Sequence, residues 1–272
     1  MAFKDLDIFV FAHRDFEVYP DNQVYKLVTM GEFETSIPLE TVKCKVSEDP
    51  LLLMEHGYSE GARLHYVWKH VPLRRYVGTS HYRRYFDFFD EIPDMDEIFK
   101  DHDAILPNFN LGWDSVWRQY CACHRSDDID MVFNIISDFY TEYTKTLESV
   151  FINSKFYPCN MFILTREMFD RYCAFVYGVL SEYDRRMGFK TDDDILAYVE
   201  TNKDKYVGSK PSWSQNGNIE YQARIQAFLM ERISTVFFCH NIKNPYMTDM
   251  ILTEVHDEYE RNYYNYREIK KK

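Results

Sequence analysis

The chain has 272 residues, of which 46% are hydrophobic, so it is long enough to bury a core of its own. Its formal net charge is -12, with 44 acidic against 32 basic side chains, which disfavours general binding to nucleic acid. No apolar run reaches the roughly 18 residues of a membrane-spanning helix, and the first residues lack the plan of a secretion signal, so we expect a cytoplasmic protein.

Strands and helices alternate along the predicted elements. Short apolar runs predict strands at residues 7–13, 76–81, 103–107 and 160–164. Apolar residues at helical spacing predict helices at 58–71, 93–100, from Ser126 onward, from Thr165 to about 183 and from 221 to about 240, with Ser126 and Thr165 as N-caps. The alternation predicts an α/β fold whose C-terminal half is mostly helical.

A single domain is expected over residues 1–245. Within it, residues 188–218 are polar, and we interpret them as a flexible insertion or lid. Residues 246–272 form a predicted C-terminal extension, whose aromatic and basic tail contains Tyr259, Tyr263, Tyr264, Tyr266 and Lys270-Lys271-Lys272. Such a tail suits weak contact with an anionic membrane surface, and a merely solubilising tail is the alternative.

The six cysteines are scattered, and none of the spacings typical of zinc sites or redox motifs occurs. Cys121, Cys123 and His124 lie close in sequence, but a helix with two small apolar thiols explains them better than a metal site. We therefore expect reduced thiols and no dedicated metal ligands.

The most unusual string is His81-Tyr82-Arg83-Arg84-Tyr85-Phe86, which places two guanidinium groups at the end of an apolar strand in an acidic protein. Guanidinium groups match phosphate oxygens, so an anionic ligand is expected here. Strand alternation predicts that His81 and Arg83 face one side while Tyr82 and Arg84 face the other, so that only one arginine touches the ligand. A structural ion pair is the alternative.

The same string, preceded by Tyr76-Val77-Gly78, resembles the hallmark of the bacterial "domain of unknown function 4422" family, whose characterised members are galactofuranosyltransferases of capsule and O-antigen synthesis. The resemblance spans roughly residues 5 to 245. Its further matching positions are His13-Arg14, Glu60, Trp68-Lys69, Asp103 to Pro107, Tyr120, His124, Asp128 to Asp130, Asn160 to Ile163, Arg224, Phe228 and Glu231-Arg232. The segment from Glu55 to Ser59 departs from the family's acidic, glycine-containing loop, which bears on the donor and the acceptor.

The resemblance implies a GT-A-like, Rossmann-like mixed sheet flanked by helices. It also implies inverting transfer of a hexose from a UDP-sugar, such as UDP-galactofuranose, to a saccharide or lipid-linked saccharide. GT-A enzymes typically place an Asp-x-Asp metal motif after a central strand, where this chain has its arginine pair. We interpret the arginine charge as taking over much of the metal's role at the departing diphosphate, so no cofactor is required. A divalent Mg or Mn ion near Asp87 and Asp90 stays an alternative.

Several of the matching positions have an expected role. Glu231 is the first choice for the base that deprotonates the acceptor, because it shares a helix face with Arg224, and Asp128 is the second. The structural alternative for Glu231 is a buried ion pair. For Asp128 it is a favourable interaction with the helix dipole. The expected donor-binding residues are His13, Arg14, Glu60, His81, Tyr82, Arg83 and Arg84. The expected acceptor-binding or sugar-binding residues are Asn160, His124, Arg224 and Arg232, although Asn160 can also cap a strand.

Two other functions stay open at this point. One is a pyranose transferase of the same fold, since side-chain identity does not give the shape of a sugar pocket. The other is a non-catalytic carbohydrate-binding module, in which the 17% of aromatic residues bind sugar and the carboxylates are structural.

Overall fold

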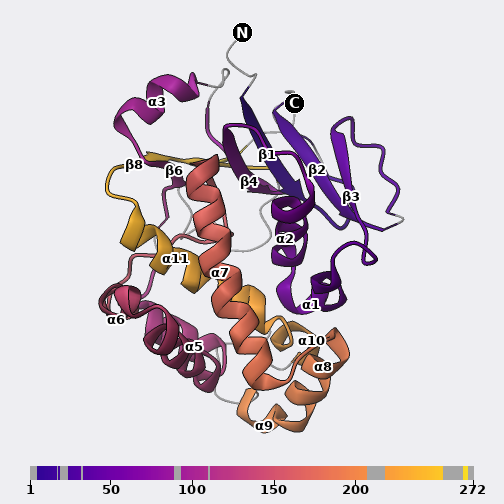
Figure 1. The fold of residues 1–272 in the computed structure, drawn as a ribbon, viewed down its shortest axis with the longest axis vertical. Helices are drawn as coiled ribbons and strands as arrows, with labels where there is room; N and C mark the ends of the chain where they lie inside the picture. The colour runs from indigo at the N-terminus through magenta and orange to yellow at the C-terminus, as the bar shows by residue number, and fades with distance from the viewer. Residues whose placement is uncertain are drawn as a thin grey trace.

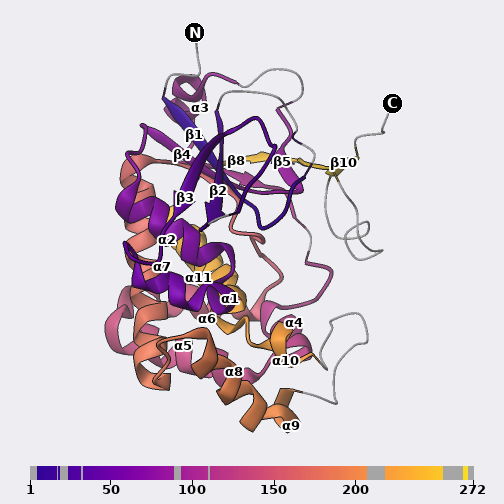
Figure 2. The same ribbon diagram turned by 90° about the vertical axis from the view of Figure 1, so that its right-hand side faces the viewer.

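The chain folds into a mixed β-sheet with helices on both faces, shown in Figures 1 and 2 as a computed structural model. The structure describes residues 5–16, 18, 24–31, 33–88, 93–109, 111–206, 218–253 and 266–268. The predicted α/β class is therefore confirmed, with strands that are parallel in one half of the sheet and mixed in the other.

The parallel half consists of β1 (Leu6–Phe11), β2 (Tyr25–Met30), β3 (Glu40–Cys44) and β4 (Tyr76–His81). On the far side of β4 follow β5 (Arg84–Phe86), β9 (Met250–Leu252) and β10 (Tyr266–Glu268). A branch leaves β4 through β7 (Phe162–Thr165), β6 (Ala104–Pro107) and β8 (Pro245–Thr248). The far edge of β4 is thus divided, because β7 pairs with it along Tyr76–Thr79 and β5 pairs with it at His81.

The central strands are buried along almost their whole length and mostly apolar, because both faces of the sheet are covered, as is typical of parallel sheets. In β1, Phe9 and Phe11 join the large core on the helical side, while Ile8 and Val10 join a smaller core. Helix α3 (Met95–Asp101) packs on the smaller core through Met95 and partly buried neighbours.

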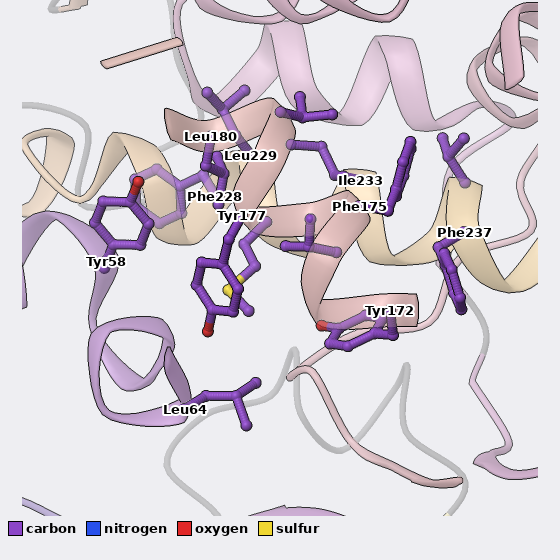
Figure 3. Packing of buried hydrophobic residues seen from close by; sticks show 14 of the residues in the cluster. Tyr58, Leu64, Tyr172, Phe175, Tyr177, Leu180, Phe228, Leu229, Ile233 and Phe237 are labelled. Carbon is purple, nitrogen blue, oxygen red and sulfur yellow. The ribbon is translucent and has the colours of Figure 1, made fainter. Parts of the chain in front are cut away.

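The large-core side of the sheet is covered by α2 (Glu60–His70), α7 (Arg166–Met187) and α11 (Ile225–Asn241). Figure 3 shows how aromatic and aliphatic side chains of α7 and α11, among them Tyr172, Phe175, Leu229 and Phe237, interdigitate in this core. The predicted cap is confirmed, since the Thr165 side chain accepts a hydrogen bond from Met168 N at 3.3 Å.

The remaining helices form the end of the molecule away from the sheet (Figures 1 and 2). They are α1 (Glu55–Tyr58), α4 (Val116–Cys123), α5 (Ser126–Phe139), α6 (Thr144–Ile152), α8 (Asp192–Thr201), α9 (Lys203–Tyr206) and α10 (Ile219–Gln222), with 3-10 turns η1 (Pro50–Met54) and η2 (Thr141–Tyr143). Ser126 begins α5, and the N-cap position falls on Arg125, which gives no side-chain cap, so that predicted cap is wrong.

Most of the described part of the range expected to be a flexible insertion is helical. Gly188 ends α7 in a left-handed conformation, and Thr191 and Asp194 then form a capping box that starts α8. Asp192 of α8 accepts hydrogen bonds from the backbone N–H groups of His56 and Gly57, both at 2.9 Å. Residues 192–206 therefore belong to the folded body, and residues 207–217 lie outside the described residues.

The C-terminal boundary also differs from the expectation. Residues 245–252 are not an extension but contribute β8 and β9 to the sheet, because β9 pairs with β5 and β8 pairs with β6. Most of the aromatic and basic tail lies outside the described residues. Within the ranges that the structure describes, no helix has both the length and the apolar character to cross a bilayer.

Candidate active site

The arginine string forms a tight turn instead of a continuous strand. β4 ends at His81, residues 82 and 83 turn, and β5 returns antiparallel with His81 opposite Arg84. The Ser80 hydroxyl donates to the Arg84 carbonyl and closes the turn. The expected strand alternation, which put Arg83 and Arg84 on opposite faces, is therefore wrong, because both line the same cavity.

Two adjoining cavities lie at this turn. The helix-side cavity has a volume of about 330 Å³ and is bounded mainly by β4, β5, α4 and α11. The strand-side cavity has a volume of about 360 Å³ and lies between the carboxyl ends of β1 and β4 and helices α1 and α2. Both are lined by Glu60, His81, Arg83 and Arg224, which form the junction of the cavities. Ligands of open α/β sheets gather at such strand ends.

The cavities carry an excess of positive charge in a chain whose net charge is -12. Among the residues that the structure describes, five arginines line them against three glutamates: Arg63, Arg83, Arg84, Arg224 and Arg232, with Glu55, Glu60 and Glu231. Burial lowers the pKa of His13 and holds the pKa of His81 well below its usual value, and the nearby arginines add to both shifts. Both histidines are thus neutral near pH 7, and the field around them favours an anion.

Arg63 was not recognised as a site residue from the sequence. Its Nη1 donates to the Ala12 carbonyl at the end of β1, at 2.6 Å, and its Nη2 lies 3.5 Å from Glu55 Oε1. Its side chain is buried, although it is charged, because it lies on the core-facing side of α2, which was predicted as an amphipathic helix. A basic residue on the apolar face of that helix was the available signal, since buried arginines are almost always paired.

Glu231 lines the helix-side cavity only. Its Oε1 accepts a hydrogen bond from the backbone N–H of Cys159 at 2.7 Å, and its Oε2 lies 3.0 Å from Arg232 Nη1. Burial raises the pKa of Glu231, while Arg232 and the Cys159 N–H act in the opposite direction. Arg232 is held in turn by Gln119, whose Oε1 accepts from Nη2 at 2.6 Å.

Backbone strain concentrates at the cavities. Among the described residues, three non-glycine residues have positive φ: Ser59 at 51°, Cys159 at 62° and Asn160 at 48°. Ser59 and Cys159 line the cavities, and Asn160 follows directly behind. Such conformations cost about 1–3 kcal/mol each and cluster at functional sites.

The other expected site residues divide into two groups. His124 lines the helix-side cavity and stacks on Phe228 with ring centroids 3.9 Å apart, and His13 and Tyr82 line the strand-side cavity. Arg14 is not among the described lining residues; its guanidinium lies 5.3 Å from the Tyr82 ring centre. Asn160 is buried behind the lining residues, so the expectation that it contacts sugar directly is not supported.

Asp128 lies outside the site. It is buried among the helices, where it accepts hydrogen bonds from the Tyr183 and Tyr206 hydroxyls at 2.9 and 3.1 Å. Burial raises its pKa to about 6. It is not among the described residues that line either cavity, so of the two carboxylates expected as base only Glu231 lies at a cavity.

Cys121 and Cys123 lie on α4, as the helical interpretation predicted, and Cys123 lines the helix-side cavity. In the part of the chain that the structure describes, no three His, Cys, Asp or Glu side chains come together as a set able to hold a metal ion.

Comparison with known proteins assigns the family and the fold. A solved structure described as the bifunctional glycosyltransferase WbbM in its apo form is similar, with a TM-score of 0.60 and 16% identity over 91% of this chain. This chain spans 45% of that protein, and the likeness supports the expected GT-A-like arrangement of sheet and helices. No curated protein matches the sequence. Residues 7–199 match the family described as Domain of unknown function (DUF4422), and since they make up most of the chain, the protein belongs to this family.

Proposed function

We propose that this protein is a glycosyltransferase that moves a sugar from a nucleotide diphosphate donor to a saccharide acceptor. The observation that carries the proposal is the group of arginines around two adjoining cavities, with the carboxylate of Glu231 on one side. The family membership and the fold shared with WbbM support it.

The donor diphosphate fits the junction of the cavities. Arg83 and Arg224 line both cavities there, and guanidinium groups bind phosphate oxygens through charge-assisted hydrogen bonds. Arg224 is held in place because its Nε donates to Ser59 Oγ at 2.7 Å. As the bond between the sugar and the diphosphate breaks, these fixed positive charges stabilise the negative charge that develops on the departing oxygen.

The two cavities then divide the substrates. The strand-side cavity, at the carboxyl ends of β1 and β4, receives the nucleotide, and the helix-side cavity receives the acceptor. The acceptor hydroxyl lies beside Glu231 and loses its proton to that carboxylate while its oxygen attacks the anomeric carbon. Attack from the face opposite the diphosphate gives inversion in one displacement.

The finer assignments follow the family. We infer a UDP-hexose donor, with UDP-galactofuranose as the first donor to test and UDP-galactopyranose as the runner-up. The acceptor is a saccharide of a capsule, O-antigen or exopolysaccharide, carried on a lipid at the inner face of the cell membrane. The tail from Tyr259 to Lys272 supplies weak contact with that surface.

A panel of nucleotide sugars tests the proposal. Release of UDP is measured for each donor with and without saccharide acceptors, and again with a chelator. We expect turnover with one donor that increases when the acceptor is added and persists in the chelator. Binding of saccharide with no UDP release from any donor would identify a non-catalytic carbohydrate-binding module instead.

A further inference from the structure

Two strained turns meet at Glu60. Ser59 directly precedes Glu60 at the start of α2, and the Cys159–Asn160 turn lies one residue before β7. The turns are 100 residues apart in the sequence, yet Asn160 Nδ2 donates to Glu60 Oε1 at 3.2 Å. Each turn also holds a residue of the site, since Ser59 contacts Arg224 and Cys159 contacts Glu231.

Asn160 is itself fixed from two further sides. Its Oδ1 accepts a hydrogen bond from Ser234 Oγ of α11 at 3.1 Å, and its carbonyl accepts one from Thr79 Oγ1 of β4. Its side chain is buried, and it is not among the described residues that line either cavity. The side chain of Asn160 therefore reaches the site through its hydrogen bond to Glu60.

Glu60 has one oxygen left for a ligand. Among the described residues no group donates to its Oε2, while Oε1 is held by Asn160. The side chain lines both cavities, at the same junction as Arg83 and Arg224. A sugar attached to a diphosphate at these arginines places its ring hydroxyls next to Glu60, and a carboxylate accepts strong hydrogen bonds from hydroxyls.

We propose that Asn160 is a positioning residue that orients Glu60 to accept hydroxyl groups of the donor sugar. The inference rests on the proposed transferase function, since it assigns the place of the sugar ring within that site. It also explains the strain at Asn160. The left-handed backbone aims the amide at Glu60, and asparagine tolerates this conformation better than most residues.

The variant Asn160→Asp tests the positioning role because aspartate also tolerates the left-handed backbone. It keeps an acceptor for Ser234 but places a second carboxyl beside Glu60. Two carboxylates at this distance share a proton, so the pair acquires a raised upper pKa. When the introduced carboxyl at position 160 is protonated, it donates a hydrogen bond to Glu60 as the Asn160 amide does. When it is ionised, the two carboxylates repel each other.

We expect the turnover of Asn160→Asp relative to wild type to fall as the pH rises from 6 to 8, because the introduced carboxyl loses its proton and the two carboxylates repel. The double variant Glu60→Gln with Asn160→Asp has a single carboxylate and should lose this pH-dependent limb, while its KM for the donor rises. Asn153→Asp, at the exposed end of α6, is the matched control and should follow the wild type.

Thermal unfolding of each variant confirms that it is folded. A ratio for Asn160→Asp that is constant from pH 6 to 8, in a folded variant, would overturn the positioning role. So would a pH-dependent limb that persists in the double variant. Absence of donor turnover in the wild type, by contrast, refutes the proposed function itself, so the two failures are distinguishable.

Discussion

Replacement of Glu231 by glutamine tests the proposed base. The amide keeps the size of the side chain, and its oxygen can still accept the hydrogen bond from Cys159 N at 2.7 Å. Two properties are lost. One is the negative charge 3.0 Å from Arg232 Nη1, and the other is the ability to take a proton from the acceptor hydroxyl.

The two losses differ in size: the lost charge affects the free energy of unfolding, and the lost base affects kcat. A hydrogen bond to a charged group contributes about 1.5–3 kcal/mol, and the side chain of Glu231 keeps 24% of its surface exposed, so we expect the lower value. The variant should therefore remain folded. Loss of a general base lowers kcat by about 10²–10⁴-fold, which corresponds to about 3–5 kcal/mol of activation free energy.

The assay measures kcat at saturating donor and acceptor, together with the donor Kd by calorimetry. We expect kcat to fall by at least about 100-fold with an unchanged Kd, because the base acts only in the transition state. The pH profile gives a second measure. Because burial raises the pKa of Glu231, wild-type kcat should fall as the pH drops through a value above the usual range for glutamate, and the variant should lack this limb.

Asp128→Asn is the control, since Asp128 is buried beside Tyr183 and Tyr206 and lies outside the site. It should keep its transfer activity. The reasoning is refuted if folded Glu231→Gln retains more than about a tenth of wild-type kcat, which a lost general base does not permit. Loss of transfer in folded Asp128→Asn would move the base to that residue.

Three further predictions concern the diphosphate, the buried acids and the tail. Arg83→Ala should raise the activation free energy that corresponds to kcat/KM for the donor by about 2–3 kcal/mol, and by more than Arg84→Ala, because Arg83 lines both cavities and Arg84 only the helix-side cavity. Lysine at position 83 should restore little of this loss. Equal and small losses in the two alanine variants would contradict binding of the diphosphate by these arginines. Burial raises the pKa of Asp184 from 3.8 to about 6, so the folded state holds its proton more tightly than the unfolded chain and the free energy of unfolding falls as the pH rises from 4 to 6. Asp184→Asn should remove this pH dependence and be more stable than wild type by up to about 3 kcal/mol at pH 7, measured by urea unfolding. The amide keeps both hydrogen bonds, since the Tyr58 hydroxyl still donates to it and a flipped Gln226 amide accepts from it. The same dependence of the unfolding free energy on pH in both proteins would contradict the prediction. A chain ending at residue 255 should no longer sediment with anionic liposomes at low salt, because each lost basic residue contributes about 1 kcal/mol, and equal binding by both chains would exclude the tail.

The sequence by itself determined four of the strands, the family and part of the site. The strands β1, β4, β6 and β7 could be predicted from short local runs, because a strand buried on both faces is mostly apolar. The spacing of Arg224 and Glu231 correctly placed both at one cavity, although the helix predicted from residue 221 is broken just before α11. Helical periodicity fixes which residues share a face even when the ends of the helix shift.

Only the tertiary structure decided the rest of the site. The turn that brings Arg83 and Arg84 to one cavity is also held from the far end of the chain, since β5 pairs with β9 and Thr253 N donates to the Arg83 carbonyl. The burial of Arg63 and the contact from Asn160 to Glu60 likewise join segments that are distant in sequence. Hydrogen bonds between such segments leave no periodic pattern in either one. The apolar helix face that holds Arg63 indicates burial, but the partner of a buried group is known only once the sheet and the helices are assembled.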